Sequence, residues 1–350
     1  MRDVAIVSFA QAPNVRCETE RNEVEMLMPV VAEALAASGI ARGEIGFTVS
    51  GSCDYIAGQP FAFVSGIDAV GPWPPINESH LEMDGAFALY EAWLKIQSGE
   101  VDSALVYAFG KSSMGDIAEV LTLQLDPYTV APLWPDAVSL AALQARVALD
   151  RSRVTERAMA EVAARSRRSA KANPNAQLRG DFDVDALLTE PYLVAPLRKH
   201  DCPPVTDGAA AVVLAAGELA SRNCARPAWI RGIDHRIECH SLGARDLARS
   251  ASTEIAGEKA GAFTGSFDVA ELHAPFTHQE LILCSALRMA PSVSVNPSGG
   301  ALAANAVMVT GLIRLGEAAA RIHAGDARRV LAHATSGPCL QQNLVCVMEA

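Results

Sequence analysis

The sequence has no basic run, and aromatic residues make up only 5% of it. Its 40 acidic residues outnumber its 29 basic residues, so the formal net charge is -11. A chain with this charge repels the phosphates of nucleic acids and of anionic membranes. We therefore expect neither as a main partner, although a local basic patch for an anionic group stays open.

The eight cysteines are scattered, and none stands in a CxxC pair or at the spacing of a zinc site. Half of the 350 residues are apolar, which is enough to build a core without disulfides. We expect reduced, mostly buried thiols, no metal site and no covalently bound cofactor.

No uninterrupted apolar run approaches the roughly 20 residues that a membrane-spanning helix needs. The first residues, 1–9, read directly as a strand and contain no signal-peptide core. We expect a cytoplasmic protein with no membrane partner.

Strand and helix patterns alternate in both ends of the chain. The first end has strand patterns at 4–9, 46–51, 75–80 and 102–110 and helical spacing at 23–38 and 85–97. A further buried strand pattern at 206–216 precedes the second end, which has strand patterns at 228–237, 267–276 and 291–295 and a helical pattern at 277–288. This alternation predicts an α/β fold.

The two ends look like copies of one unit. Ile96-Gln-Ser-Gly-Glu resembles Ile322-His-Ala-Gly-Asp, 226 positions later, whereas Ile76-Asn-Glu-Ser aligns with Val295-Asn-Pro-Ser at an offset of 219. The difference predicts a second-copy helix that is longer by about two turns. Pairing the copies predicts a five-layered α/β/α/β/α body, in which ligands gather where helix starts from the two halves converge.

Between the copies, strand patterns disappear and charged or alanine-rich helices are expected at 139–150 and 155–173. We therefore divide the chain into three parts. These are an N-terminal half (1–115 and 202–217), an inserted helical and loop domain (116–201) and a C-terminal half (218–350).

A strand pattern at 291–295 breaks at Pro297 and at the paired glycines Gly299 and Gly300, and a helical pattern follows at once. Glycines let backbone amides approach a ligand, and the free amides of a helix start favour an anion. Ser298, Gly299 and Gly300 are therefore candidates for ligand binding. An ordinary strand-to-helix turn is the alternative.

Four motifs together resemble the thiolase superfamily: Asp207-Gly-Ala-Ala-Ala-Val-Val, Glu271-Leu-His-Ala-Pro-Phe-Thr, Asn296-Pro-Ser-Gly-Gly and the terminal segment 330–348. The resemblance covers the whole chain and is greatest for the sterol-carrier-type thiolases, also called lipid-transfer proteins. It implies an acyl-CoA substrate, with coenzyme A as part of that substrate held near Ser298, Gly299 and Gly300.

The same resemblance exposes a departure from the family. Family thiolases carry a nucleophilic cysteine at the start of the helix expected at 85–97, where this sequence has Glu82. No cysteine occurs between Cys53 and Cys202, so no acyl-enzyme can form at that position. Asn305 falls near a missing family histidine, whereas His273 matches the family histidine that helps to hold the thioester oxygen.

Each candidate residue has a structural alternative. His273 either holds an oxygen of the substrate or is a satisfied core histidine. His333, expected at the end of a strand, is either an acid/base group or a core histidine. Glu82 either moves a proton or caps the helix, and Asn305 either donates to an oxyanion or ties the first turn of a helix.

Three further residues are also candidates for a role in the site. We expect His278 and Glu280 on a helix surface or at an interface, one turn past the histidine of the motif. Cys339 follows Pro338 in a glycine-flanked loop, and we consider it the one cysteine placed to replace the missing thiol, with a buried packing role as the alternative.

An oxyanion site without a nucleophile suits retro-aldol cleavage of a β-hydroxyacyl-CoA, a reaction that the resemblance implies for steroid or lipid side chains. His273 and Asn305 would hold the enolate oxygen, and His333 or Glu82 would move the proton. One alternative is a non-catalytic acyl-CoA- or lipid-binding subunit of a heteromeric complex. Another is an acyltransferase of the thiolase or Claisen type that uses Glu82 or Cys339.

The resemblance also implies partners. It predicts a homodimer paired through the strand at 75–80, with the inserted domain lying over the site as a lid that contacts coenzyme A. It further implies a small partner protein with an OB-fold and a zinc ribbon.

Overall fold

The computed structural model describes residues 2–350 and contains ten strands in one sheet, arranged as two five-stranded halves. The first half has the order β1-β7-β4-β2-β3, with β1 (Val4–Gln11), β2 (Phe47–Gly51), β3 (Glu78–Leu81), β4 (Ser103–Lys111) and β7 (Asp207–Ala216). The second has the order β8-β12-β11-β9-β10, with β8 (Ala228–Ile237), β9 (Val269–Leu272), β10 (Ser294–Val295), β11 (Arg329–Ser336) and β12 (Gln342–Glu349).

The two halves have the same topology, which confirms the predicted duplication. In each half three neighbouring strands are parallel, β3-β2-β4 in one and β10-β9-β11 in the other. In each half the next two pairings are antiparallel. The halves join where β1 pairs with β8, through Ala5 with Trp229 and Ile6 with Ala228.

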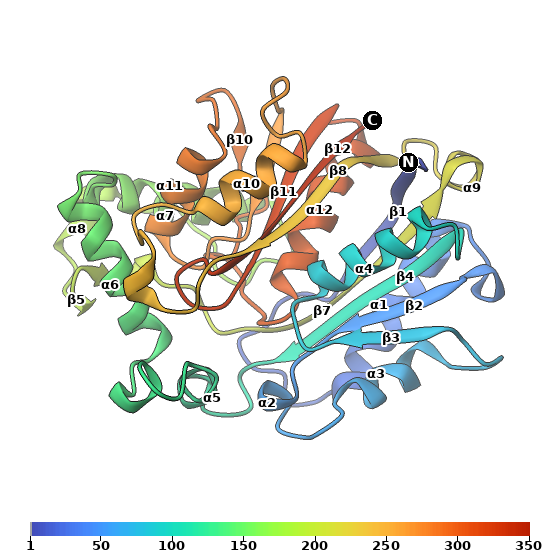
Figure 1. Ribbon diagram of the computed structural model, residues 1–350, viewed down its shortest axis with the longest axis horizontal. Helices are drawn as coiled ribbons and strands as arrows, with labels where there is room; N and C mark the ends of the chain where they lie inside the picture. The colour runs from blue at the N-terminus through green and yellow to red at the C-terminus, as the bar shows by residue number, and fades with distance from the viewer. Residues whose placement is uncertain (1) are drawn as a thin grey trace.

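Helices form three layers around these half-sheets (Figure 1). The central layer contains α4 (Gly85–Gln97) and α12 (Thr310–Ala324), which contact each other and strands of both halves. One outer layer contains α1 (Glu23–Ser38) and α3 (Phe63–Val70), and the other contains α10 (Ala251–Lys259) and α11 (Thr277–Ala286). This is the predicted five-layered α/β/α/β/α fold.

The strands are apolar on both faces because they lie between helix layers. Along β1, Val4 and Ile6 join the central core, whereas Ala5 and Val7 join the core beneath α1. Successive side chains of a strand point to opposite faces, so one short apolar strand contributes to two cores.

The segment between β4 and β7 lies to one side of the layers (Figure 1). It contains α5 (Ile117–Leu123), α6 (Ala137–Asp150), α7 (Glu156–Ser169), α8 (Val184–Thr189) and a small antiparallel pair, β5 (Tyr192–Val194) and β6 (Leu197–Arg198). Two more short helices are α2 (Asp54–Ala57) and α9 (Gly217–Asn223). The β5–β6 pair corrects the prediction that this segment holds no strands.

The structure corrects the predicted position of the last long helix. We expected a helix to follow Gly300 at once, but α12 begins only at Thr310. It has 15 residues against 13 in α4, so most of the extra length of the second copy lies in the loop at 301–309 and not in the helix. The alanine-rich loop sequence has helical composition, but Met308 adopts a φ of 75°, which a right-handed helix excludes.

Candidate functional site

A single carboxylate joins the starts of the two central helices. Asp84 is the N-cap of α4, and its Oδ1 accepts hydrogen bonds from the backbone N of Ala86 at 2.9 Å and of Leu312 at 3.0 Å. Its Oδ2 accepts from the N of Gly311 at 2.8 Å. Helix starts from both halves therefore converge at one point, as the duplication predicted.

The loop that carries Asn305 closes over this convergence. The Asn305 backbone N donates to Thr206 Oγ1 at 3.0 Å, and the N of Gly85, the first residue of α4, donates to the Met308 carbonyl at 2.9 Å. Asn305 thus lies in a loop pinned to the first half. The alternative that it ties the first turn of a helix is wrong, because α12 starts five residues later.

His273 follows β9 and lies beside Asn305. Its backbone N donates to the His333 carbonyl at 3.1 Å, and its Nδ1 accepts from the N of Thr335 at 3.4 Å. Burial, with the nearby His333 and Arg314, lowers the pKa of His273 to about 3, while a hydrogen bond with the Asn305 side chain acts in the opposite direction. The ring is therefore neutral at physiological pH and carries its proton on Nε2.

Glu82 precedes Asp84 but does not cap α4. Its carboxylate accepts from the backbone N of Asp54 at 3.0 Å, at the start of α2, and partial burial raises its pKa. Glu82 is an exposed residue, and no hydrogen bond joins it to His273, His333 or Asn305 among residues 2–350. It lies three residues before Gly85 and so flanks the point where the helix starts meet.

A thiol that the sequence analysis overlooked lies beside Glu82. Cys53 follows β2, its Sγ accepts from Gln124 Nε2 at 3.3 Å, and its thiol interacts with the Glu82 carboxylate. Burial raises the pKa of Cys53, and the Glu82 charge adds to this effect. Because β2 and β3 are parallel neighbours, the residues that follow them share one sheet edge. Predicted strand pairing could therefore have brought Cys53 and Glu82 together.

His333 occupies a different face of the sheet. It lies inside β11, not at its end as expected, and it is fully buried. Its neighbour two residues earlier, Leu331, packs in the core beneath α10 and α11, whereas Ala332 and Ala334 pack in the central core. The alternation along β11 places the His333 side chain on the outer face, away from Asn305.

The tautomer of His333 follows from its partner Asn343. The Asn343 Nδ2 donates to the Leu340 carbonyl at 2.8 Å and to Ser252 Oγ at 2.7 Å, so its Oδ1 faces His333 Nε2 at 3.0 Å. Nε2 must then carry the proton, and the lone pair of Nδ1 has no hydrogen-bond partner within residues 2–350. Burial lowers the pKa of His333 to about 4.

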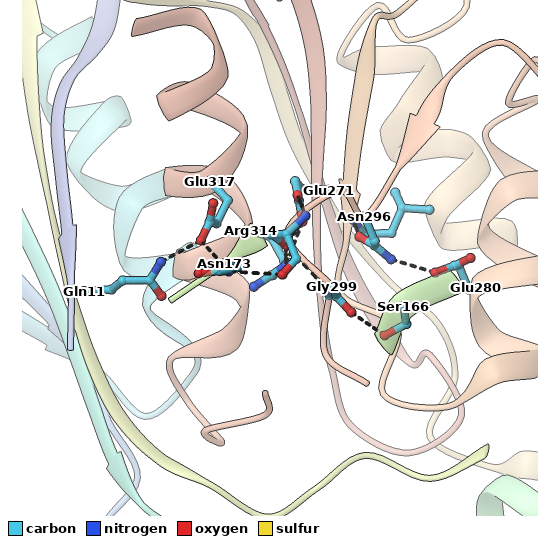
Figure 2. A network of polar contacts seen from close by, with 12 residues as sticks. Gln11, Ser166, Asn173, Glu271, Glu280, Asn296, Gly299, Arg314 and Glu317 are labelled. Atoms are coloured by element: carbon cyan, nitrogen blue, oxygen red, sulfur yellow. Dashed lines mark hydrogen bonds and ion pairs between the residues drawn. The ribbon is translucent and has the colours of Figure 1, made fainter. Parts of the chain in front are cut away.

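The turn of Ser298, Gly299 and Gly300 is buried and held by a polar network (Figure 2). The Ser298 N and Oγ donate to the Glu271 carboxylate at 3.0 and 2.7 Å, and Arg314 Nη1 donates to the same carboxylate at 2.6 Å. Ser166 Oγ of α7 donates to the Gly299 carbonyl at 2.6 Å.

The backbone amides of Gly299 and Gly300 donate hydrogen bonds to other protein atoms. The Gly299 N donates to the Asn296 carbonyl at 2.9 Å, and the Gly300 N donates to Ser298 Oγ at 3.3 Å. A Cβ at Gly299 would lie 2.7 Å from the Cβ of Ala170, so the glycine permits close packing beneath the inserted segment. The structure thus brings this turn together with Glu271 and Arg314, and not with Glu82.

The helix-surface position expected for His278 and Glu280 is wrong. His278 and Glu280 are buried, because α6 and α7 cover α11: His278 Nε2 lies 3.2 Å from Gln144 Oε1, and Glu280 pairs with Arg165. Cys339 is also buried, its Sγ donates to the Leu140 carbonyl at 3.4 Å, and burial raises its pKa to about 11. Cys339 therefore packs beneath α6, which confirms the alternative of a buried packing role.

The described residues contain no cluster of three or more histidine, cysteine, aspartate or glutamate side chains suited to a metal ion. Within residues 2–350, none of the helices has the length and apolar character to cross a bilayer. All eight cysteines are free thiols.

Comparisons with known proteins agree with the fold. No protein-family model matches the chain. An acetyl-CoA acetyltransferase of Methanocaldococcus jannaschii is 26% identical over 349 residues, which covers 91% of this chain and 89% of that protein. The acetyl-CoA acetyltransferase of Methanothermobacter thermautotrophicus is 26% identical over 256 residues, with 65% and 66% covered.

Sterol carrier protein 2 of Bos taurus is 23% identical over 265 residues, and the chain spans about half of its length, 49%. Among solved structures, a chain of the Ltp2-ChsH2(DUF35) aldolase superposes with a TM-score of 0.82 at 17% identity, over 99% of this chain and 98% of that one. The chain is thus similar in sequence to acetyl-CoA acetyltransferases and to sterol carrier protein 2, and it has the duplicated five-layered fold of the superposed aldolase chain.

Proposed function

We propose that this protein acts on a coenzyme A thioester and cleaves a β-hydroxyacyl-CoA by a retro-aldol reaction. The observation that carries the proposal is that His273 and Asn305 meet through a side-chain hydrogen bond, in a loop whose Met308 carbonyl accepts from the first residue of α4. By the resemblance, Glu82 stands where family thiolases carry the nucleophilic cysteine. Two hydrogen-bond donors without a nucleophile suit a reaction through an enolate and not through an acyl-enzyme.

In this reaction a base removes the proton of the β-hydroxyl group. The Cα–Cβ bond then breaks, its electrons move to Cα and the thioester oxygen as an enolate, and the β-carbon leaves as a ketone or an aldehyde. Protonation of Cα gives the shortened acyl-CoA. On substrate binding the neutral His273 would turn its Nε2–H from the Asn305 side chain to the enolate oxygen, and the Asn305 side-chain amide would donate a second hydrogen bond.

Glu82 is the favoured base. It is exposed beside the converging helix starts, and its raised pKa makes the carboxylate a stronger base than an ordinary glutamate. His333 is the second candidate because its Nδ1 lone pair is free, but its side chain lies on the outer face of the sheet. Variants of the two residues separate these assignments.

The names of the relatives support this class of chemistry. Two relatives are acetyl-CoA acetyltransferases, and the superposed structure is an aldolase that includes ChsH2(DUF35). We therefore propose a partner protein of this kind, with an OB-fold and a zinc ribbon, and steroid or lipid side chains as substrates. We also propose a homodimer through the exposed edge of β3, with the inserted segment as a lid. The free cysteines are consistent with the cytoplasm.

The test is to incubate the purified chain, alone and with a co-encoded partner, with a branched β-hydroxyacyl-CoA. Released ketone and shorter acyl-CoA are expected in equal amounts, and His273→Ala should slow the formation of both by about 100-fold. Arg222→Gln, an exposed change on α9, is the matched control. If the thioester binds but neither product forms, both with the chain alone and with the partner present, the aldolase proposal is wrong.

A second candidate is a non-catalytic acyl-CoA- or lipid-binding subunit. The burial of His333 on the outer face favours it, since this leaves fewer acid/base groups near Asn305. Calorimetry that finds acyl-CoA binding, with turnover of the complex unchanged by His273→Ala and His333→Ala, would select this candidate. Acyl transfer is a third candidate function. It requires a covalent acyl adduct on the protein, which mass spectrometry after incubation with an acyl-CoA would detect.

A further inference from the structure

A cavity of about 350 Å³ lies in the outer layer of the second half, where three distant segments meet. Its lining comes from the turn between α6 and α7, from the residues before and in α10, and from α11. This volume is within the usual range for small-ligand sites.

The cavity is basic in a protein with a net charge of -11. Arg153 forms no ion pair with any of residues 2–350, and Arg249 shares the one carboxylate of the lining, Glu254, with Arg288. The lining therefore holds two guanidinium groups and one carboxylate, an excess of about one positive charge, and Arg288 outside the lining also pairs with that carboxylate.

The wall opposite the charges is apolar. Val154, Ala248 and Ile282 belong to the core beneath α10 and α11, and Leu281 and Ala286 continue this surface. The hydroxyl of Ser285 makes no hydrogen bond to a described residue and is available to a ligand. A charged rim over an apolar wall selects a compact molecule with one anionic head and a short apolar body.

The cavity lining does not include Glu82, His273 or Asn305, the residues favoured for chemistry. α10 and α11 cover the outer face of the second half-sheet, whereas Asp84 and α12 lie on its inner side. One connection exists: Ser250 Oγ of the lining lies 3.4 Å from Asn343 Nδ2, and Asn343 holds His333.

We propose that this cavity is a second binding site, for a small organic phosphate monoester with a short apolar body. The guanidinium groups of Arg153 and Arg249 match an anionic phosphate, because arginine forks bind phosphate oxygens in pairs. The site is independent of the proposed aldol chemistry.

Titration calorimetry with phenyl phosphate tests the proposal, with benzoate and neutral benzamide as probes of the head group. Phenyl phosphate should bind saturably, benzoate more weakly and benzamide not at all. The double change Arg153→Gln and Arg249→Gln should weaken binding by about tenfold or more. Arg222→Gln, an exposed arginine on α9, should leave it unchanged.

Ser285→Phe supplies a second variant, since Ser285 is exposed and a phenyl ring there would fill the cavity without removing charge. It should abolish binding while the thermal unfolding temperature stays unchanged. Three results would overturn the proposal: no saturable binding to the native chain, equal affinity in both cavity variants, or displacement of phenyl phosphate by the acyl-CoA substrate.

Discussion

Asp84 accepts a hydrogen bond from the backbone amide of Gly311, a residue 227 positions later in the chain. Because the same carboxylate also binds Ala86 and Leu312, the relative position of α4 and α12 depends on this one side chain. Glu82 and Asn305 flank the junction, so the geometry of the proposed site depends on it as well.

Asp84 should also make stability depend on pH. Burial raises its pKa from 3.8 to about 6, so between these values the folded chain keeps a proton that the unfolded chain loses. Its contribution to the free energy of unfolding therefore falls by about 3 kcal/mol as the pH rises from 3.8 through 6.

Asp84→Asn should remove this dependence. Urea unfolding of the native chain and the variant at several pH values between 4 and 7 measures it, because the difference between the two curves isolates Asp84. Asp102→Asn, an exposed change, is the control. A constant difference across the whole pH range would contradict the assignment.

Loss of either proposed oxyanion donor should slow turnover. His273→Ala and Asn305→Ala should each reduce kcat by about 100-fold, the usual cost of one oxyanion-hole donor. Steady-state kinetics with a β-hydroxyacyl-CoA gives kcat and KM separately, and KM should change little. If both variants retain at least a third of the native kcat, neither residue holds the enolate oxygen.

Glu82→Gln should be more damaging to turnover than His333→Gln. Removing the general base should lower kcat by about 100-fold, and glutamine keeps the size of the side chain and an oxygen that can accept from the Asp54 amide. His333→Gln should act mainly on stability, since its side chain lies on the outer face. Steady-state kinetics and thermal unfolding of both variants show which residue is the base. A larger loss of kcat in His333→Gln than in Glu82→Gln would assign the base to His333.

The fold should depend on Glu271 and Arg314 together, because their buried charges compensate each other (Figure 2). Both side chains are at most 3% exposed, so Arg314→Met leaves an uncompensated carboxylate and should destabilise the fold by about 3–5 kcal/mol. The double change with Glu271→Leu should recover part of this loss. Denaturant unfolding measures all three variants, and a double variant no more stable than Arg314→Met would contradict a mutually compensated pair.

No cysteine should carry an acyl group. Burial raises the pKa of Cys53 and raises that of Cys339 to about 11, so neither provides thiolate at neutral pH. Intact-mass and peptide mass spectrometry after incubation with acyl-CoA should find no thioester, while iodoacetamide should label the exposed Cys17 and Cys239 first. A stable adduct on Cys53 would replace the aldolase proposal with acyl transfer.

The sequence predicted what local patterns encode. α1 and α4 have the expected boundaries, because Gly39 in the left-handed conformation ends the first and Asp84 opens the second. The duplication also followed from aligned residues, and with it came the convergence of the two central helices. We expected His273 and Asn305 to lie close together because, by the resemblance, each falls at or near a family histidine of the site.

Features that depend on tertiary contacts were not predictable in this way. The loop at 301–309 has a helical composition, yet contacts to Thr206 and Gly85 of the other half hold it open. His278 and Glu280 look like surface residues until α6 and α7 cover them. Cys53 is 29 positions from Glu82 in the sequence, and only the parallel pairing of β2 with β3 brings them together.

The capping of α12 by Asp84 also bears on how the two copies could have diverged. Val309, the residue at the N-cap of α12, provides no side-chain hydrogen bond, and the acceptor comes from the first copy. A chain that held only the second copy would begin this helix with unpaired amides. The duplicated units are therefore no longer interchangeable modules, and neither can be transplanted or replaced without the other.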